Sequence, residues 1–177
     1  MNPSFLLLRR PLAEALARYG AWIGTPEFGP PREVAEDDAL ELALDGDQWK
    51  GLAVYVFTSG PWTVFEELSG GLSARSAGDW VRLADGGDLV FAGYNDAIGY
   101  GELLRVEGGR LVRHFLQDEQ EPGAAVDIGR LPEESEPMTH WADVARWVDE
   151  QDDELTGRER GWLWIHEHTW PADDPSS

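Results

Sequence analysis

The sequence feature that most constrains the fold is an apolar run at residues 52–57, Leu-Ala-Val-Tyr-Val-Phe. Both sets of alternating positions in this run are apolar, so a strand formed here would be buried on both faces and would lie in the middle of a sheet. The turn residues Ser59-Gly60-Pro61 follow, and a β-prone segment occupies residues 62–68. This order predicts a second strand that pairs antiparallel with the first.

Further strands are predicted on both sides of this pair, at residues 5–9, 40–44, 89–94 and 161–170. Gly108-Gly109 separates two more β-prone runs, 102–107 and 110–116, and predicts a tight hairpin because a type I′ turn needs positive φ at both central residues. In that hairpin Val106 would lie opposite Leu111, and Glu107 opposite Arg110.

Three segments have helical signals. Apolar residues recur with helical spacing over residues 11–19, and Gly20 is a natural stop. Ser76 and Asp79 have the spacing of a capping box and predict a short helix that runs to Ala84. Thr139 can cap a third helix, which would continue into the acidic run 149–154.

These elements predict an α+β fold, a mostly antiparallel sheet of about five to seven strands with two or three covering helices. We expect a single domain over residues 1–177, since this length is typical of one domain. Pro, Gly and acidic residues predict acidic loops near 24–38 and 117–137, and a flexible tail is expected at 171–177.

The charge of the chain limits its partners. Asp and Glu number 34 against 14 Lys and Arg, so the net charge is −20 at pH 7. A field of this sign repels nucleic acid and anionic membranes and attracts basic proteins. The chain has no Cys, which excludes disulfides and Cys-based zinc sites. No signal peptide or membrane span is recognisable, so we expect a cytoplasmic protein.

No catalytic or cofactor motif emerges, and no cofactor is expected. His166 and His168 would share one face of the last strand and are weak candidates for a metal site, because no third ligand is placed by the sequence. Glu66 and Glu67 beside Trp62 are the best local carboxylate pair for a hydrolase, but in a strand they point to opposite faces. The Gly-rich segment 93–101 lacks the Lys-Ser/Thr of a phosphate-binding loop.

Two stretches, Trp62–Gly70 and Leu89–Ala97, resemble small uncharacterised bacterial proteins, and the size and acidity of the chain are similar to those of toxin-immunity proteins. This resemblance transfers no residue roles. It implies a non-catalytic cytoplasmic protein that occludes a basic protein partner, for example a toxin. The residues predicted to bind that partner, as an acidic rim with aromatic anchors, are Glu66, Glu67, Tyr94, Asn95, Asp96, Tyr100 and Glu102.

Two other classes stay open at this stage. One is a small hydrolase that acts on a small-molecule or carbohydrate substrate through carboxylates or a His-x-His metal site. The other is a structural or regulatory domain without a dedicated partner. The sequence says nothing about the oligomeric state.

Overall fold

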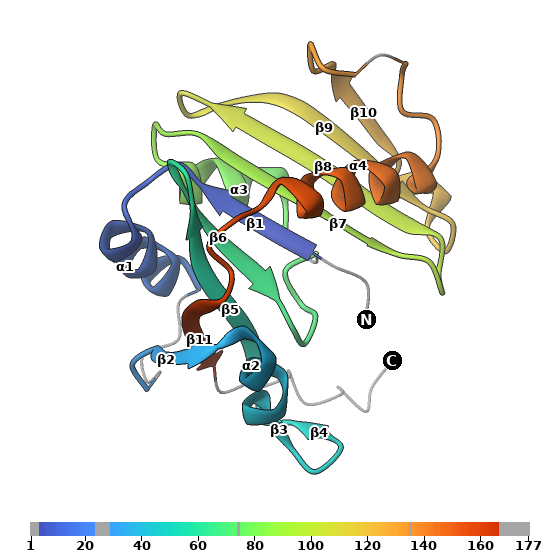
Figure 1. Cartoon of the computed structure of the whole chain (residues 1–177). Helices are drawn as coiled ribbons and strands as arrows, with labels where there is room; N and C mark the ends of the chain where they lie inside the picture. Colours follow the sequence, from blue (N-terminus) through green and yellow to red (C-terminus); the bar gives the residue numbers. More distant parts are fainter. Residues whose placement is uncertain (1–3, 24–28, 74, 135, 167–177) are drawn as a thin grey trace, which may run out of the picture.

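The apolar run at 52–57 forms the core of strand β5 in a nine-stranded antiparallel sheet of the computed structural model, which describes residues 4–23, 29–73, 75–134 and 136–166 (Figure 1). The strands of this sheet are β1 (Ser4–Leu8), β2 (Arg32–Ala35), β5 (Leu52–Ser59), β6 (Trp62–Glu67), β7 (Leu89–Asn95), β8 (Tyr100–Glu107), β9 (Arg110–Asp118), β10 (Val126–Gly129) and β11 (Arg160–His166). A separate two-stranded sheet joins β3 (Leu44–Asp45) to β4 (Gln48–Trp49).

Four α-helices are described: α1 (Leu12–Ile23), α2 (Glu36–Ala43), α3 (Ala77–Ala84) and α4 (Trp141–Glu154). A short 3-10 turn, η1, occupies Pro122–Ala124. The α+β class predicted from the sequence is therefore confirmed, but the main sheet has more strands than the five to seven expected.

The strand order is β10-β9-β8-β7-β1-β6-β5-β11-β2, which puts β1 at the centre. Strand β1 pairs with β6 on one side and with β7 on the other. The pairs β5–β6, β7–β8 and β8–β9 are hairpin neighbours, whereas the neighbours of β1 lie far from it in sequence. The predicted antiparallel pairing of β5 with β6 is confirmed.

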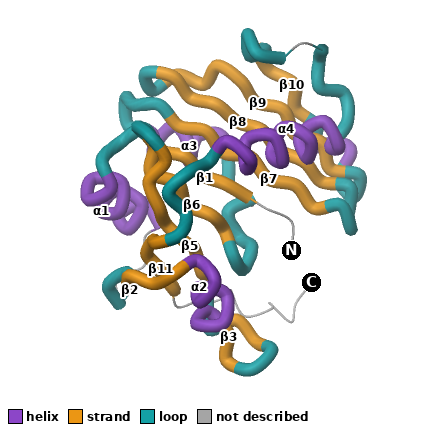
Figure 2. Tube along the Cα trace, viewed as in Figure 1, coloured by secondary structure: helices purple, strands orange, loops and turns teal. Residues whose placement is uncertain are grey.

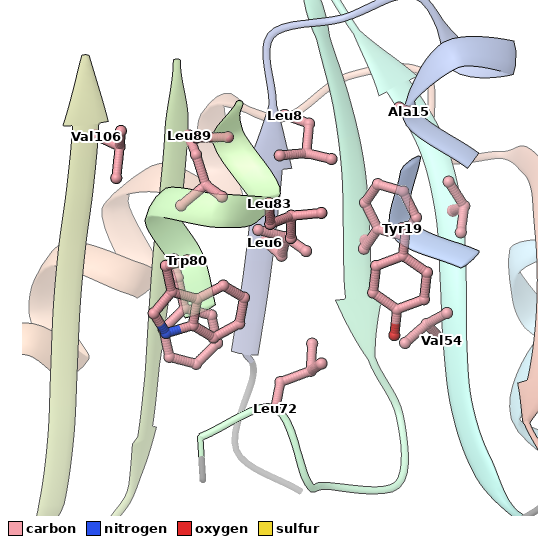
Figure 3. Packing of buried hydrophobic residues seen from close by; sticks show 14 of the residues in the cluster. Leu6, Leu8, Ala15, Tyr19, Val54, Leu72, Trp80, Leu83, Leu89 and Val106 are labelled. Carbon is pink, nitrogen blue, oxygen red and sulfur yellow. The ribbon is translucent and has the colours of Figure 1, made fainter. Parts of the chain in front are cut away.

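Helices cover both faces of the sheet (Figure 2). Helices α1 and α3 pack on the face that carries Leu6 and Leu8 of β1. Tyr19 and Trp80 fill this layer, with Tyr19 stacked on Phe65, and Leu72 closes one end of it (Figure 3). Helix α4 crosses β7 and β8 on the opposite face, where Val144 and Val148 pack with Phe5 and Leu7. Two buried layers therefore flank the central strands.

Two local predictions are confirmed to the residue. Gly108 and Gly109 both have positive φ, 53° and 76°, and the hairpin register places Val106 opposite Leu111 and Glu107 opposite Arg110. In α3 the capping box forms as predicted, since the Ser76 side chain and the Asp79 side chain each accept a hydrogen bond from the other's backbone N–H. Both features depend on neighbours in sequence, and sequence patterns describe such features well.

The predictions for residues 24–44 are largely wrong. Residues 24–28 lie outside the described residues, residues 29–31 form a loop as predicted, and residues 32–38 form β2 and the start of α2. The alternation over 40–44 does not form a strand there: it belongs mainly to α2, in which Ala39 and Ala43 are buried one turn apart while Leu40 is exposed. The acidic run Glu36-Asp37-Asp38 fills the first turn of this helix, where negative charge is favoured by the helix dipole.

Three other boundaries differ from the prediction. Helix α1 continues through Gly20 to Ile23 instead of stopping there. The predicted loop 117–137 contains η1 and the edge strand β10. The residue that caps α4 is His140, not Thr139: the His140 side chain accepts from the Ala142 N–H. The tail at 171–177 lies outside the described residues.

Candidate functional site

A cavity of about 430 Å³ lies at one end of the main sheet, where β1 and β8 begin and β6 and β7 end. The antiparallel pairing brings these four strand ends together, although residues 4, 67, 95 and 100 are spread over more than half of the sequence. The segments that follow β6 and β7 form its rim, and Trp49 of β4 adds an aromatic wall from the small sheet.

The structure brings most of the predicted partner-binding residues together at this place. Five of the seven line the cavity: Glu67, Tyr94, Asn95, Asp96 and Tyr100. Glu102 lies next to it and lines an adjoining cavity of about 350 Å³ that shares Ser73 and Tyr100 with the first. The role of these residues in binding a partner remains a prediction.

Glu66 does not reach the cavity. It points to the opposite face of the sheet, as its alternation with Glu67 requires. There its Oε2 lies 3.5 Å from Nε of Arg158, which also contacts Asp152 and lies 3.7 Å from Glu36. Burial raises the pKa of Glu66, and the Arg158 guanidinium opposes this shift. Glu66 therefore takes part in an internal ion-pair cluster and is removed from the proposed rim.

Two carboxylate residues line the cavity, Glu67 and Asp96, and Glu67 is the more buried of the two, with 6% of its surface exposed. Its Oε1 accepts a hydrogen bond of 2.7 Å from the Leu72 N–H, which ties the segment after β6 over the sheet. Burial raises the pKa of Glu67 to about 7, and the bond from Leu72 only partly offsets this. At neutral pH the Glu67 carboxyl group therefore exchanges readily between its neutral and charged forms.

A hydrogen-bonded chain of three side chains borders the cavity. The Tyr100 hydroxyl donates to Glu102 Oε2 at 2.6 Å, and His114 Nε2 lies 2.9 Å from Glu102 Oε1. Glu102 is 2% exposed and His114 7% exposed. Burial and the neighbouring Glu102 carboxylate raise the pKa of Tyr100, so its hydroxyl stays a donor at physiological pH. These hydrogen bonds hold the Tyr100 ring in place between the two cavities.

Sequence reasoning missed His114, and a β-bulge explains why. Val106 pairs with Leu111 but Arg105 pairs with Arg113, so one extra residue, Val112, enters β9. A regular hairpin would place His114 on the opposite face from Glu102, whereas the bulge moves it to the same face. No signal in the hairpin sequence marks the position of this bulge.

The turn from β7 to β8 supplies the polar rim of the cavity. Asn95 Oδ1 accepts from the Ala97 N–H at 3.1 Å, and Gly99 has a φ of 67°. These are features of a tight connection between strands. Next to the lining residue Ser4, Gly93 leaves space that the Ser4 side chain fills: a Cβ on Gly93 would come within 2.3 Å of Ser4 Oγ.

The strand predicted at 161–170 is described up to His166, and its aromatic face is covered. Trp164 is 8% exposed and packs on Tyr19 of α1, and His166 lies beside both rings with 2% exposure. Burial lowers the pKa of His166 to about 4, so the ring is neutral at physiological pH. His168 lies outside the described residues, and the metal hypothesis for the pair therefore stays untested.

Two properties of the described residues bear on other classes of function. Within the described ranges, no three His, Asp or Glu side chains gather closely enough to hold a metal ion. None of the helices described combines the length and the apolar character needed to cross a membrane.

Comparison with protein-family models, with curated proteins and with solved structures found no match for the chain.

Proposed function

We propose that the chain is a non-catalytic binding protein that occludes a basic protein partner, and that the cavity at the end of the sheet is its recognition site. One observation carries this proposal: the described lining combines the acidic residues Glu67 and Asp96 with the aromatic residues Trp49 and Tyr100, and includes no Lys, Arg or His. Carboxylates and aromatic faces both attract cations.

The charge of the whole molecule also favours a cationic partner. A net charge of −20 produces a field that steers a cationic partner toward the protein and weakens as salt screens it. Tyr and Trp supply large contact area with few rotatable bonds, so they are suited to the centre of an interface. The partner's basic site would be covered by the cavity rim, and occlusion alone would inhibit it.

A protein that neutralises a basic toxin inside the bacterial cytoplasm is the concrete form of this proposal. It agrees with the resemblance of the sequence to toxin-immunity proteins and with the acidity of the chain. Such a role requires tight and rapid association, which electrostatic complementarity promotes mainly through the association rate.

Affinity capture from an extract of the source cells tests the proposal. We expect the chain to retain a basic protein at low salt and to lose it as NaCl rises. A double variant in the cavity, Glu67→Gln with Asp96→Asn, should reduce capture by about ten-fold or more, the effect of removing charge-assisted contacts.

The matched control for this experiment is the double variant Asp38→Asn with Glu41→Gln, two exposed residues of α2. It removes the same kinds of group, so it reports the effect of net charge alone. Equal losses in the two variants would contradict a specific role for the cavity. A partner whose capture is independent of salt would contradict the electrostatic mechanism.

A hydrolase is the second candidate, because Glu67 and Glu102 lie on one face of the sheet. Gly93 of β7 pairs with Glu102 of β8 on one side and with Ser4 of β1 on the other. The β1–β6 register pairs Phe5 with Glu66, so the next pair along it is Ser4 with Glu67. Three strand spacings then separate the two carboxylate residues, roughly 14 Å between Cα atoms. The two side chains would have to extend toward each other to reach the separation of about 6.5–9.5 Å between carboxyl groups that inverting glycosidases use. In that arrangement Glu67, whose pKa is raised by burial, would be the general acid and Glu102 the base.

Release of nitrophenol from aryl glycosides tests the hydrolase candidate. Activity that is lost in both Glu67→Gln and Glu102→Gln would favour the enzyme over the binding protein. If the wild-type chain turns over the substrate no faster than these variants, the hydrolase candidate is excluded.

A further inference from the structure

The protein already contains one arginine side chain held by carboxylates and aromatic rings. The Arg158 guanidinium carbon lies 5.2 Å from the ring centroid of Phe57 and 5.6 Å from that of Phe5. Asp152 forms an ion pair with Arg158, and Glu66 Oε2 lies 3.5 Å from it. This cluster occupies the α4 face of the sheet and shows which groups hold a guanidinium in this fold.

The cavity presents the same kinds of group at the end of the sheet. Glu67, the next residue after Glu66, supplies a carboxylate, and Trp49 and Tyr100 supply aromatic walls. The Tyr100 ring is held in place, because its hydroxyl donates a hydrogen bond to Glu102. Rings fixed in advance lose little entropy when a ligand binds.

The low exposure of Glu67 to water favours arginine over lysine as the bound residue. Glu67 is only 6% exposed, so a cation that reaches its carboxylate has to give up much of its own water. Guanidinium is more weakly hydrated than ammonium, stacks on aromatic faces and can form two parallel hydrogen bonds to one carboxylate. A lysine ammonium, which is strongly hydrated and has no plane to stack, gains less at such a site.

We propose that the cavity binds a single arginine side chain of the partner, with the guanidinium against the Glu67 carboxylate and stacked on the aromatic walls. This inference rests on the proposed function, because it names the chemical group by which the basic partner is recognised.

Binding of a guanidinium would be linked to the charge of Glu67. The titratable groups around it are Tyr19 from α1, Tyr100 from β8 and Asp96 from the cavity rim. Burial raises the pKa of Tyr19 and of Tyr100, so both stay neutral at physiological pH. Because a cation stabilises the charged carboxylate, it should displace a proton from Glu67 and bind more weakly when the pH is low.

Titration of the full chain with small amides, followed by backbone NMR shifts of Gly70 and Asn95, tests the inference. The probes are the N-acetyl methylamides of arginine, lysine and citrulline, which is the neutral isostere of arginine. We expect the arginine amide to bind at least about ten-fold more tightly than the citrulline amide and several-fold more tightly than the lysine amide.

Two further measurements exclude indirect effects. Glu67→Gln should weaken arginine binding about ten-fold, whereas Glu41→Gln on α2 should leave it unchanged. In the wild-type chain, which needs no substitution, affinity should fall between about pH 8 and about pH 5 as Glu67 takes up its proton. Equal affinity for the arginine and citrulline amides, or an affinity that ignores Glu67 and pH, would overturn the inference.

The outcomes also separate this inference from the proposed function. Salt-sensitive capture of a basic protein without binding of the arginine amide would refute the arginine site and leave the binding function standing. Binding of the amide at Glu67 without capture of any basic protein would support the site and refute the proposed function.

Discussion

At the scale of single residues, Glu67 combines two roles that oppose each other. Its Oε1 holds the Leu72 N–H, which helps to close one end of the layer beneath α1 and α3. Burial at the same time makes its charged form costly. A glutamine at this position would keep the acceptor and remove the charge, so the chain retains a carboxyl group at the expense of stability. Residues of this kind are frequent at functional sites.

The stability of the fold should therefore depend on pH through Glu67. Its pKa is about 7 in the folded chain, above the ordinary 4.5, so the folded state binds the extra proton between these values. The free energy of unfolding should then fall as pH rises from about 4.5 to about 7, by on the order of 3 kcal/mol from this group alone. His166, with a pKa lowered to about 4, acts in the opposite direction below about pH 6.5.

Comparison of the wild-type chain with Glu67→Gln isolates the effect of Glu67. Urea unfolding should show the variant gaining about 1–3 kcal/mol relative to the wild type between pH 5 and pH 8. Glu41→Gln, at an exposed position of α2, is the matched control. If the two difference curves have the same slope, the carboxyl group of Glu67 does not titrate as inferred.

At the scale of secondary-structure elements, α1 shows how packing decides where a helix ends. Gly20 is a natural stop in the sequence, yet the helix passes through it to Ile23. A Cβ at position 20 would lie 2.9 Å from Cη2 of Trp164, so the glycine provides room for the indole ring. The long-range contact with β11 overrides the local propensity of Gly20 to end the helix.

Two glycine-to-alanine variants test this reading. Gly78 lies exposed in α3, where a Cβ would be 3.7 Å from Ser76 Oγ, so Gly78→Ala should stabilise the chain by about 0.5–1 kcal/mol through helix propensity. Gly20→Ala should be destabilising by about 1–3 kcal/mol, because the methyl group overpacks against Trp164. Thermal unfolding of both variants gives the comparison. Similar stabilisation by both would show that Trp164 moves aside at little cost.

The same contrast explains how much of the fold and site the sequence could predict. The Gly108-Gly109 hairpin and the α3 capping box depend on adjacent residues, and both were predicted correctly. The placement of β1 between β6 and β7, the bulge at Val112 and the edge strand β10 depend on pairing at a distance. Five of the proposed site residues come from two local signals, the carboxylate pair Glu66-Glu67 and the Gly-rich segment 93–101, whereas Trp49 and His114 reach the two cavities only through tertiary structure.

At the scale of the whole molecule, the acidic residues produce a field that attracts cations, and their mutual repulsion destabilises the fold. Seven acidic residues and no basic residue occupy 33–47, and thirteen occupy 118–154 with only Arg130 and Arg146. The structure places much of this charge on ordered elements, α2 and α4, rather than on loops alone. The acidic surface is therefore held in a defined shape, as a specific binding surface requires.

Salt should stabilise the free protein. Raising NaCl from about 10 mM to about 300 mM should screen the mutual repulsion of carboxylates and increase stability by about 1 kcal/mol, or about 2–4 °C in Tm. Scanning calorimetry at pH 7.5 measures this shift. The same change in salt at pH 5, where carboxylates carry less charge, should have a smaller effect. A Tm that falls as salt rises would mean that surface ion pairs such as Arg9–Asp88 outweigh the repulsion.

The position of β11 has a consequence for the synthesis of the chain on the ribosome. Strand β2, made early, pairs in the main sheet only with β11, the last strand described, and β11 lies between it and β5. Segment 32–35 therefore has no partner strand in that sheet until residues 160–166 have left the exit tunnel. This edge of the sheet therefore stays incomplete during synthesis until β11 is available to pair.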